Sequence, residues 1–217
     1  MNAALARLEA LKRDGTKIAC AIAWDTPTAR ILDESGVDLV SVGDSVGLNL
    51  WGREREGDVT VDELVLLTRA VRAGVTRAAV STDLPDATVA SAQRLLDAGA
   101  DVVKVEGDAA LELAAAGVPV FAQLDGGDGT PDALVERARA LESAGALLLD
   151  FRHSGPEAGR ADTAAVGIPV IGGLGGGPWL DGRMRLLSRL VDVAPAIREA
   201  VAVYVDDVRS ARAVRGD

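Results

Sequence analysis

The chain has 217 residues, of which 48% are apolar and 26% charged, and its mean hydropathy is +0.19. This composition is typical of one compact globular domain, excludes a disordered chain, and places the length in the range of a single α/β barrel. The formal net charge of -10 argues against nucleic acid and membrane surfaces as partners, because their phosphate groups would be repelled.

The N-terminal region, Met1–Lys12, has the pattern of an amphipathic helix and not of a cleavable signal. No apolar run approaches the ~18 residues of a membrane span. The single cysteine, Cys20, lies in an apolar run, which excludes an intramolecular disulfide and predicts a buried thiol in a reducing compartment. We therefore expect a cytoplasmic protein.

Short apolar runs alternate with longer helical patterns along the chain, as in a parallel sheet wound by crossover helices. The predicted strands are Lys17–Trp24, Asp38–Gly43, Thr76–Thr82, Asp101–Val105, Val118–Gln123, Ala146–Phe151 and Ile168–Gly172, with Arg183–Leu187 as a candidate eighth. The predicted helices are Thr26–Ser35, Val61–Ala73, Ala87–Ala98, Asp108–Ala116, Pro131–Ser143, Glu157–Ala165 and Ala194–Val208.

Several predicted helices end in a small residue followed by glycine just before the next strand, at Gly36, Gly99, Gly117 and Gly145. Glycine past a helix end takes the left-handed conformation that turns the chain back to the sheet. Repeated joints of this kind predict a (β/α)8 TIM barrel, with residues 1–217 forming a single domain. An open doubly wound sheet has the same alternation and is the structural alternative.

Polar side chains gather where the predicted strands run into the following loops, which is where a barrel places its active site. They are Asp44, Ser45, Asp83, Lys104, Glu106, Gln123, Asp150, Arg152 and His153. Asp44 and Asp83 follow adjacent strands with no His or Cys cluster nearby, which suits a hard divalent ion such as Mg²⁺. The alternative is that both aspartates cap the segments that follow.

Three other features leave two interpretations open. Lys104 and Glu106 share one face of a strand, where they either form an ion pair or both face a ligand. The segment Gly172–Gly177 either brings backbone N–H groups to an anion or only relaxes a tight loop. His153, the only histidine, is either a proton carrier or a residue of a surface loop.

Collinear segments of the chain carry a family pattern: Asp25-Thr26-Pro27-Thr28-Ala29, Val42-Gly43-Asp44-Ser45-Val46-Gly47, Val59-Thr60-Val61-Asp62-Glu63 with Thr68-Arg69-Ala70-Val71, Asp83-Leu84-Pro85, and Val103-Lys104-Val105-Glu106-Gly107. In combination they resemble the ketopantoate hydroxymethyltransferase family, which belongs to the phosphoenolpyruvate mutase and isocitrate lyase superfamily. The resemblance covers most of the chain.

The resemblance implies a TIM-barrel enzyme in which Asp44 and Asp83 hold Mg²⁺, or another divalent ion, and Glu106 lies in the outer shell of that ion. It implies that Ser45 and Lys104 contact a 2-oxo acid substrate. The implied reaction transfers a hydroxymethyl group to that substrate, or is a related aldol-type step, through an enolate that the cation stabilises. Members of the family are homo-oligomers.

The sequence also departs from the family pattern. Gln123 replaces a histidine that follows the fifth strand, and Arg152 occupies the position of the catalytic glutamate. Asp150 and His153 are the candidate replacements for the lost base. The segment after the fifth strand is reduced to Asp125–Gly129 and the loop after the third strand is shortened, which puts methylene-tetrahydrofolate as the donor in doubt.

Two further hypotheses follow from these departures. One is a different lyase or mutase-type reaction of the superfamily without folate, in which Arg152 binds a substrate carboxylate. The other is a non-catalytic paralogue that acts as a binding or assembly subunit. In either case the apolar C-terminal helix around Ala196–Val208 is a candidate interface between subunits.

Overall fold

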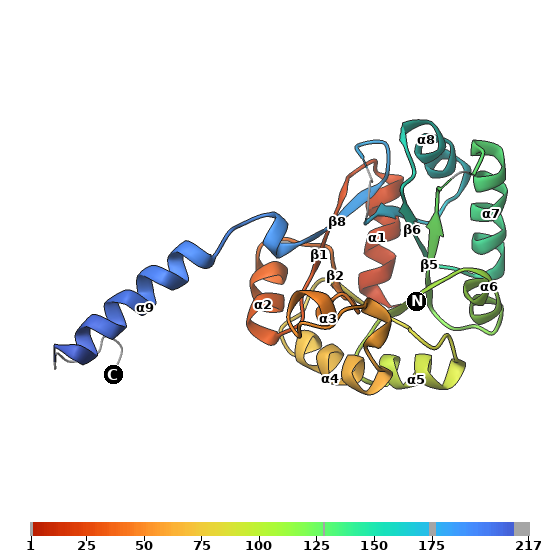
Figure 1. The fold of residues 1–217 in the computed structure, drawn as a ribbon. Helices are drawn as coiled ribbons and strands as arrows, with labels where there is room; N and C mark the ends of the chain where they lie inside the picture. The colour runs from red at the N-terminus through yellow and green to blue at the C-terminus, as the bar shows by residue number, and fades with distance from the viewer. Residues whose placement is uncertain (1, 128, 174–176, 211–217) are drawn as a thin grey trace. The chain divides into compact units, whose positions relative to one another are not determined.

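The computed structural model describes residues 2–127, 129–173 and 177–210. Within these ranges eight parallel strands close into a barrel in chain order (Figure 1). The strands are β1 (Ile18–Ile22), β2 (Leu39–Val42), β3 (Ala79–Asp83), β4 (Val102–Glu106), β5 (Val120–Asp125), β6 (Leu148–Arg152), β7 (Val170–Gly172) and β8 (Gly182–Leu186). The predicted TIM barrel is confirmed, and the open doubly wound sheet is wrong.

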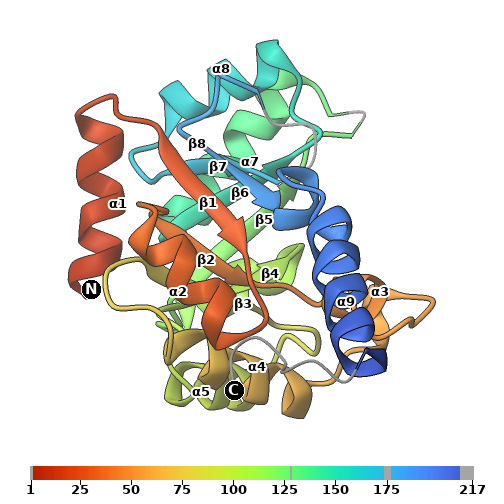
Figure 2. The ribbon, with the colours of Figure 1, turned by 90° about the vertical axis from the view of Figure 1, so that its left-hand side faces the viewer.

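Helices connect the strands and form the outer layer of the barrel (Figures 1 and 2). The long ones are α1 (Ala3–Arg13), α2 (Thr26–Glu34), α4 (Val61–Arg72), α5 (Val89–Asp97), α6 (Asp108–Ala115), α7 (Pro131–Ala144) and α8 (Pro156–Ala165). Two short helices that the sequence pattern did not predict, α3 (Val46–Asn49) and the 3-10 helix η1 (Glu56–Asp58), lie between β2 and α4. No helix of the described residues is both long enough and apolar enough to cross a membrane.

The chain divides into two compact units, Met1–Arg185 and Leu186–Asp217. The first unit contains the barrel. The second contains the 3-10 helix η2 (Leu187–Arg189) and the helix α9 (Ala194–Arg209), in which no residue is buried. The expectation that residues 1–217 form a single domain stays a prediction.

The barrel interior is apolar at the amino ends of its strands. Inward-facing side chains there form one buried cluster with Leu5 and Leu8 of α1: Ile18, Cys20, Leu39, Ala79, Val102, Phe121, Leu148, Ile171 and Met184. Lys12 of α1 forms an ion pair with Asp181 at 2.9 Å. α1 therefore covers this end of the barrel (Figure 2), and Cys20 is the buried thiol that the sequence predicted.

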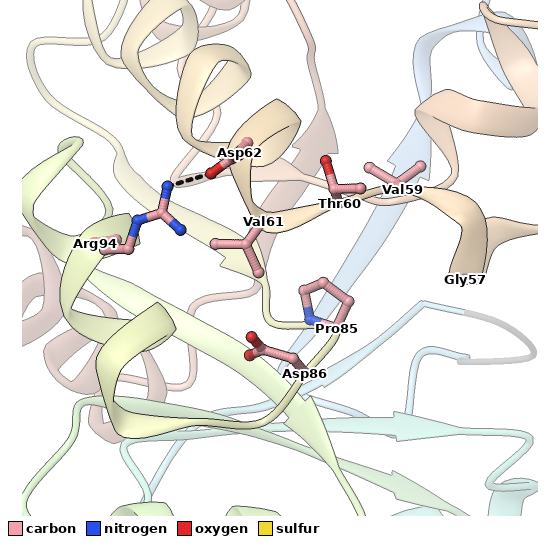
Figure 3. Close-up of a pocket in the computed structure, with 8 residues that line it drawn as sticks. All are labelled: Gly57, Val59, Thr60, Val61, Asp62, Pro85, Asp86 and Arg94. Atoms are coloured by element: carbon pink, nitrogen blue, oxygen red, sulfur yellow. Dashed lines mark hydrogen bonds and ion pairs between the residues drawn. The ribbon is translucent and has the colours of Figure 1, made fainter.

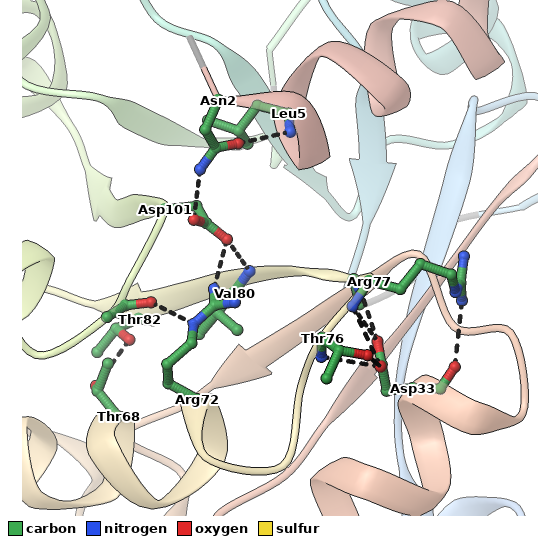
Figure 4. A network of polar contacts seen from close by, with 12 residues as sticks. Asn2, Leu5, Asp33, Thr68, Arg72, Thr76, Arg77, Val80, Thr82 and Asp101 are labelled. Carbon is green, nitrogen blue, oxygen red and sulfur yellow. Dashed lines mark hydrogen bonds and ion pairs between the residues drawn. The ribbon is translucent and has the colours of Figure 1, made fainter.

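Two carboxylates tie helices to the segments that lead into β3 and β4 (Figure 4). Asp33 of α2 accepts hydrogen bonds from the backbone N–H groups of Thr76, Arg77 and Ala78, at 2.7–3.2 Å. Asp101 accepts from the N–H of Val80 at 2.7 Å and pairs with Arg72 at 2.6 Å. Burial acts to raise the pKa of Asp33, but the hydrogen bonds outweigh it and the pKa is lowered.

The glycine joints between helices and strands are confirmed. Gly36, Gly99, Gly117 and Gly145 all have positive φ angles, between 82° and 111°. At Gly99 an added Cβ would lie 2.6 Å from Cγ of Arg72, so a side chain is excluded by space as well as by backbone conformation. These turns bring each helix directly back to the barrel.

The predicted strands differ from the observed ones in a systematic way. The apolar runs placed the first residue of some strands too early. Examples are Thr76 and Val118, where the strand has not yet begun. At the other end, β3, β4, β5 and β6 continue to a polar residue: Asp83, Glu106, Asp125 and Arg152 respectively. Hydrogen bonding to the neighbouring strand, and not apolar character, fixes these ends.

Candidate active site

Inward-facing residues change from apolar to polar toward the carboxyl ends of the strands. Side chains two residues apart on a strand share a face. Because Val102 of β4 belongs to the apolar interior cluster, Lys104 and Glu106 also point inward. The same alternation from the other apolar residues of that cluster turns a further set inward: Ser41, Ser81, Asp83, Gln123, Asp125, Asp150 and Arg152.

Lys104 lies among carboxylates at the centre of this polar set. Its Nζ is 3.0 Å from Oδ1 of Asp83 and 3.6 Å from Oδ2 of Asp150, and all three side chains are largely buried. Burial alone lowers the pKa of the Lys104 ammonium, but the charges of Asp83, Asp150 and Asp44 outweigh it and the pKa is raised. Lys104 is thus a fixed cation inside the barrel.

Glu106 takes a different partner. Gln123 Nε2 donates a hydrogen bond to Oε2 of Glu106 at 2.6 Å, across the β4–β5 register that sets these two residues opposite each other. Glu106 is exposed, whereas Lys104 turns to β3 and β6. The interpretation of Lys104 and Glu106 as a buried ion pair is therefore wrong, since longer-range partners satisfy both side chains.

Asp44, Ser45 and Asp83 meet at the carboxyl ends of the adjacent strands β2 and β3. Oδ2 of Asp83 accepts a hydrogen bond from the backbone N–H of Asp44 at 3.0 Å. A Cβ added at Gly43 would lie 3.1 Å from Oγ of Ser45 and 3.6 Å from Oδ2 of Asp83, so both side chains adjoin this glycine. Asp83 thus binds the segment that follows β2 and not the one that follows its own strand, which the capping interpretation had expected.

Oδ1 of Asp83 is the oxygen that indicates a site for a metal cation. It is buried and, the Lys104 ammonium apart, has no hydrogen-bond donor among the described residues. No group of three or more His, Cys, Asp or Glu side chains in the described part of the chain is arranged to hold a metal ion. A hard divalent ion that takes one or two carboxylates, and completes its shell with water and substrate oxygens, fits Asp44 and Asp83.

Asp150 is buried deeply on the inward face of β6, with 2% of its surface exposed. Its Oδ1 accepts a hydrogen bond from the N–H of Gly173 at 3.1 Å. An added Cβ at Gly173 would lie only 3.3 Å from that oxygen, so glycine permits the close approach. Of the predicted anion-binding segment Gly172–Gly177, residues 174–176 lie outside the described residues.

Asp125 was not among the residues predicted for the site. It ends β5, and both of its carboxylate oxygens lie 3.1–3.2 Å from Nδ1 of His153. Burial acts to raise the pKa of Asp125, but a hydrogen bond from the N–H of Gly127, and His153 and Arg152 beside it, outweigh burial and lower the pKa. The signal in the sequence was a carboxylate two residues beyond Gln123 on one strand face.

The backbone around His153 is tightly constrained. His153 has a φ of +50°, which is uncommon for a residue other than glycine. Gly126 N–H donates to the carbonyl of Arg152 at 2.8 Å, and Trp179 Nε1 donates to Oγ of Ser154 at 3.2 Å. An added Cβ at Gly126 would lie 2.7 Å from the carbonyl oxygen of His153, so the two loops are in direct backbone contact.

Trp24 follows β1, is partly buried, and packs against buried apolar residues of the core. Its indole Nε1 donates a hydrogen bond to the carbonyl oxygen of Gly43 at 2.8 Å. This bond places the indole next to the segment that carries Asp44 and Ser45.

A separate pocket of about 440 Å³ lies between the starts of α4 and α5 (Figure 3). Asp62 and Arg94 form an ion pair along one side of it, and Pro85 and Asp86, which follow β3, lie on the other. Its lining residues are Gly57, Val59, Thr60, Val61, Asp62, Pro85, Asp86 and Arg94. It contains none of the residues predicted for the active site.

Comparison of the structure with solved structures identifies the same barrel in enzymes of one superfamily. A 2,3-dimethylmalate lyase of the PEP mutase/isocitrate lyase superfamily aligns with a TM-score of 0.71 at 16% identity, covering 95% of this chain and 89% of its own. Phosphonopyruvate hydrolase in complex with oxalate and Mg²⁺ aligns with a TM-score of 0.71 at 14% identity, covering 99% and 90%. At these identities the likeness shows the fold.

Sequence comparison shows the family. The family model of ketopantoate hydroxymethyltransferase matches residues 2–129. A 3-methyl-2-oxobutanoate hydroxymethyltransferase from Alkalilimnicola ehrlichii is 35% identical over 248 residues, covering 94% of this chain and 89% of the relative. The enzyme of the same name from Pyrobaculum islandicum is 35% identical, covering 86% and 88%. The chain therefore belongs to the ketopantoate hydroxymethyltransferase family.

Proposed function

We propose that this protein is an enzyme that forms or cleaves a carbon–carbon bond of a 2-oxo acid, with Mg²⁺ or another divalent ion, at the carboxyl end of the barrel. The single observation that carries the proposal is the arrangement of Asp83. One of its oxygens accepts the N–H of Asp44, and the other is buried beside the Lys104 ammonium. The anionic oxygens of Asp83 and the Lys104 ammonium therefore lie next to each other.

The candidate site contains both anionic and cationic side chains, and this combination suits a 2-oxo acid. Asp44 and Asp83 would hold the divalent ion, and Glu106, held by Gln123, would lie outside its first shell. When bound, such an ion draws electron density from the keto oxygen and makes the neighbouring C–H more acidic. The Lys104 ammonium and the Ser45 hydroxyl supply a charge and a donor for the substrate oxygens.

Hydroxymethyl transfer is the first form of this proposal, because the curated relatives carry that name. We propose that methylene-tetrahydrofolate is not the donor. β5 ends at Asp125 and α7 begins at Pro131, which leaves only a short connection to cover a bulky cofactor. A small aldehyde, or a reaction in the cleavage direction, fits the reduced rim better.

A second candidate function is a lyase or mutase-type reaction of the superfamily without folate. The observation that favours it is Arg152, which ends β6 on the inward face, half-buried, beside Asp125. A guanidinium at this place suits bidentate binding of a second substrate carboxylate. A substrate with two carboxylates would then replace the monocarboxylate of hydroxymethyl transfer.

We propose in addition that the protein works as a homo-oligomer. In α9 the exposed apolar residues Ile197, Val201, Tyr204 and Val208 recur at helical spacing and so share one face. A face of this kind is suited to packing against another subunit. A non-catalytic paralogue that keeps only this assembly role is the remaining hypothesis.

The test is proton exchange at the carbon next to the keto group. The protein is incubated with Mg²⁺ and 2-oxoisovalerate in D₂O, and the C3–H signal is followed by NMR. The proposal predicts that this signal is lost with Mg²⁺ and is retained with EDTA. Retained binding of Mg²⁺ and 2-oxoisovalerate without exchange would contradict enolisation and favour the second function or the non-catalytic paralogue.

A further inference from the structure

One pair of polar side chains at the mouth of the barrel has no role in the proposal above. Asp125 ends β5, and His153 follows β6, with its Nδ1 3.1 Å from Oδ2 of Asp125. We infer that these two residues form the proton-transfer unit of the site, in which Asp125 positions the imidazole and Nε2 of His153 takes and returns the proton. The inference rests on the proposed function, because it names the residues that move the proton in that reaction.

The hydrogen bond to Asp125 fixes which nitrogen of the ring is the base. A carboxylate accepts hydrogen bonds and donates none, so Nδ1, which faces both oxygens of Asp125, must carry the hydrogen. The lone pair of the neutral ring then lies on Nε2. Asp125 is itself held by the N–H of Gly127 at 2.9 Å, so the ring is oriented from behind by a fixed carboxylate.

His153 keeps this place against the preference of its own backbone. A left-handed conformation is unfavourable for a residue other than glycine. The carbonyl of Arg152 before it is bonded to Gly126, and the hydroxyl of Ser154 after it is bonded to Trp179. Both flanks are therefore anchored, and the imidazole is presented at a defined position and not on a free loop.

Its two neighbours on β6 are less suited to accept a proton. Asp150 has Oδ1 bonded to the N–H of Gly173 and Oδ2 3.6 Å from the Lys104 ammonium, and only 2% of its surface is exposed. Arg152 carries a guanidinium, which stays protonated. The side chain of His153 is 53% exposed and open to a ligand.

The pair lies nearer the open end of the barrel than Lys104, which is opposite Phe121 in the strand register. On β5, Asp125 is two residues beyond Gln123, which is about 7 Å further toward the open end of the barrel. Gln123 lies opposite Glu106 and Asp150 in the strand register. A 2-oxo acid with its polar end on Lys104 would extend toward this outer layer, where His153 lies.

The proposed step is balanced within the site and the substrate. Nε2 of the neutral ring accepts the proton from C3 of the 2-oxo acid, and the electron pair of the broken C–H bond remains on the substrate as the enolate. The ring becomes an imidazolium beside the Asp125 carboxylate. In D₂O the ring exchanges its proton for a deuteron and returns that deuteron to C3.

The orientation of the ring can be measured without any activity. His153 is the only histidine of the chain, so the long-range ¹H–¹⁵N spectrum of the tag-free protein contains one imidazole. At a pH where the ring is neutral, we expect the Nδ1–H tautomer in the unmodified protein and the Nε2–H tautomer in Asp125→Asn, whose amide can donate to Nδ1. An Nε2–H tautomer in the unmodified protein would overturn the positioning role of Asp125.

The proton transfer is tested with 2-oxoisovalerate and Mg²⁺ in D₂O. Asn tolerates the left-handed backbone, so His153→Asn is expected to fold, and it should lower C3–H exchange at least about hundredfold. Asp125→Asn should lower exchange at least about tenfold with little change in 2-oxoisovalerate affinity, because the ring remains but is misoriented. Asp97→Asn, an exposed aspartate of α5, is the control and should exchange as the unmodified protein does.

Each outcome separates the inference from the function on which it rests. If the unmodified protein exchanges and His153→Asn keeps at least half of its rate, the inference is overturned and the proposed function stands. Absence of exchange in the unmodified protein overturns the enolisation function and with it the catalytic role of the pair. Loss of exchange in both variants, with the Nδ1–H tautomer in the unmodified protein, supports the inference.

Discussion

The two ends of the barrel hold their carboxylates in different ways. At the amino ends, Asp33 accepts hydrogen bonds from backbone N–H groups that lead into β3, and Asp101, just before β4, accepts one from the N–H of Val80 in β3. At the carboxyl ends, Asp83 and Asp150 face a buried ammonium, and one oxygen of Asp83 has no other donor among the described residues. The first end uses charge to fix backbone, and the second leaves charge available to a ligand.

This difference predicts where substitutions change stability and where they change binding. The apolar layer with Leu8 and Phe121 separates the two ends. Variants at the amino end should therefore change the free energy of unfolding without changing Mg²⁺ affinity. Variants at the carboxyl end should change ligand binding, or leave buried carboxylates without a counter-charge that a bound cation can replace.

The largest effect is expected for Lys104→Met. The substitution leaves Asp83 and Asp150 buried together without a counter-charge, and loss of one partner of a buried ion pair costs about 3–5 kcal/mol. Urea unfolding in EDTA measures the loss, and added Mg²⁺ should recover part of it because a bound cation replaces the charge. Lys17→Met, at an exposed lysine, is the matched control. Equal destabilisation by both substitutions would remove Lys104 from the centre of the charge cluster.

Asp33→Ala should reduce the free energy of unfolding by about 2–4 kcal/mol, because three backbone N–H groups lose their acceptor. Mg²⁺ affinity should not change. Since the folded state lowers the pKa of Asp33, its contribution is complete above the pKa of an unfolded aspartate, about 4, and is lost as pH falls below it. The difference from the unmodified protein, measured by urea unfolding, should thus shrink from pH 7 to pH 3. Exposed Glu34 supplies the control, Glu34→Ala.

Asp162 of α8 extends the comparison of the two ends, because it is a carboxylate that belongs to neither network. It has no hydrogen-bond partner among the described residues. Burial raises its pKa to about 6. Below the unfolded pKa both states are protonated, and as pH rises through about 6 the folded state acquires a buried charge and loses stability. Asp162→Asn should therefore stabilise the protein by about 1–3 kcal/mol at pH 8 and leave it unchanged near pH 3.5. An equal gain at both pH values would show that burial of the charge is not the cause.

Asp83→Asn tests the carboxyl end directly. A neutral amide of nearly the same shape should weaken Mg²⁺ binding at least about tenfold without loss of the fold, measured by calorimetric titration and circular dichroism. Asp86→Asn, three residues further along the chain and in the loop after β3, is a suitable control. An unchanged titration would remove Asp83 from the metal site.

The fold was predictable because its signals are local. Buried parallel strands require apolar runs, and glycines such as Gly99 and Gly145 mark the turns before them. The helix α3 was missed, because four residues after Ser45 carry neither periodicity nor a side-chain cap. Strand ends were placed too early at Asp125, since a polar residue was assigned to the loop although it continues the ladder with Arg152.

The positions of the candidate site residues were predictable, and their pairings were not. Lys104, Asp83 and Asp150 were found from their positions at strand ends, but the partner expected for Lys104 was Glu106 on the same strand. Register across β3, β4, β5 and β6 decides which side chains meet, and no local pattern encodes it. Asp33 was missed for the same reason, because its partners lie 43 to 45 residues away.

The central claim is that Asp44 and Asp83 together hold a divalent ion that presents a 2-oxo acid. The most direct measurement is a crystal structure with Mn²⁺ and 2-oxoisovalerate, in which anomalous scattering locates the ion. We expect one peak about 2–2.3 Å from a carboxylate oxygen of Asp44 or Asp83, with both carboxylates within reach through at most one water and the keto acid chelating the ion. A peak elsewhere, or ligand bound at Lys104 without any ion beside these two aspartates, would contradict it.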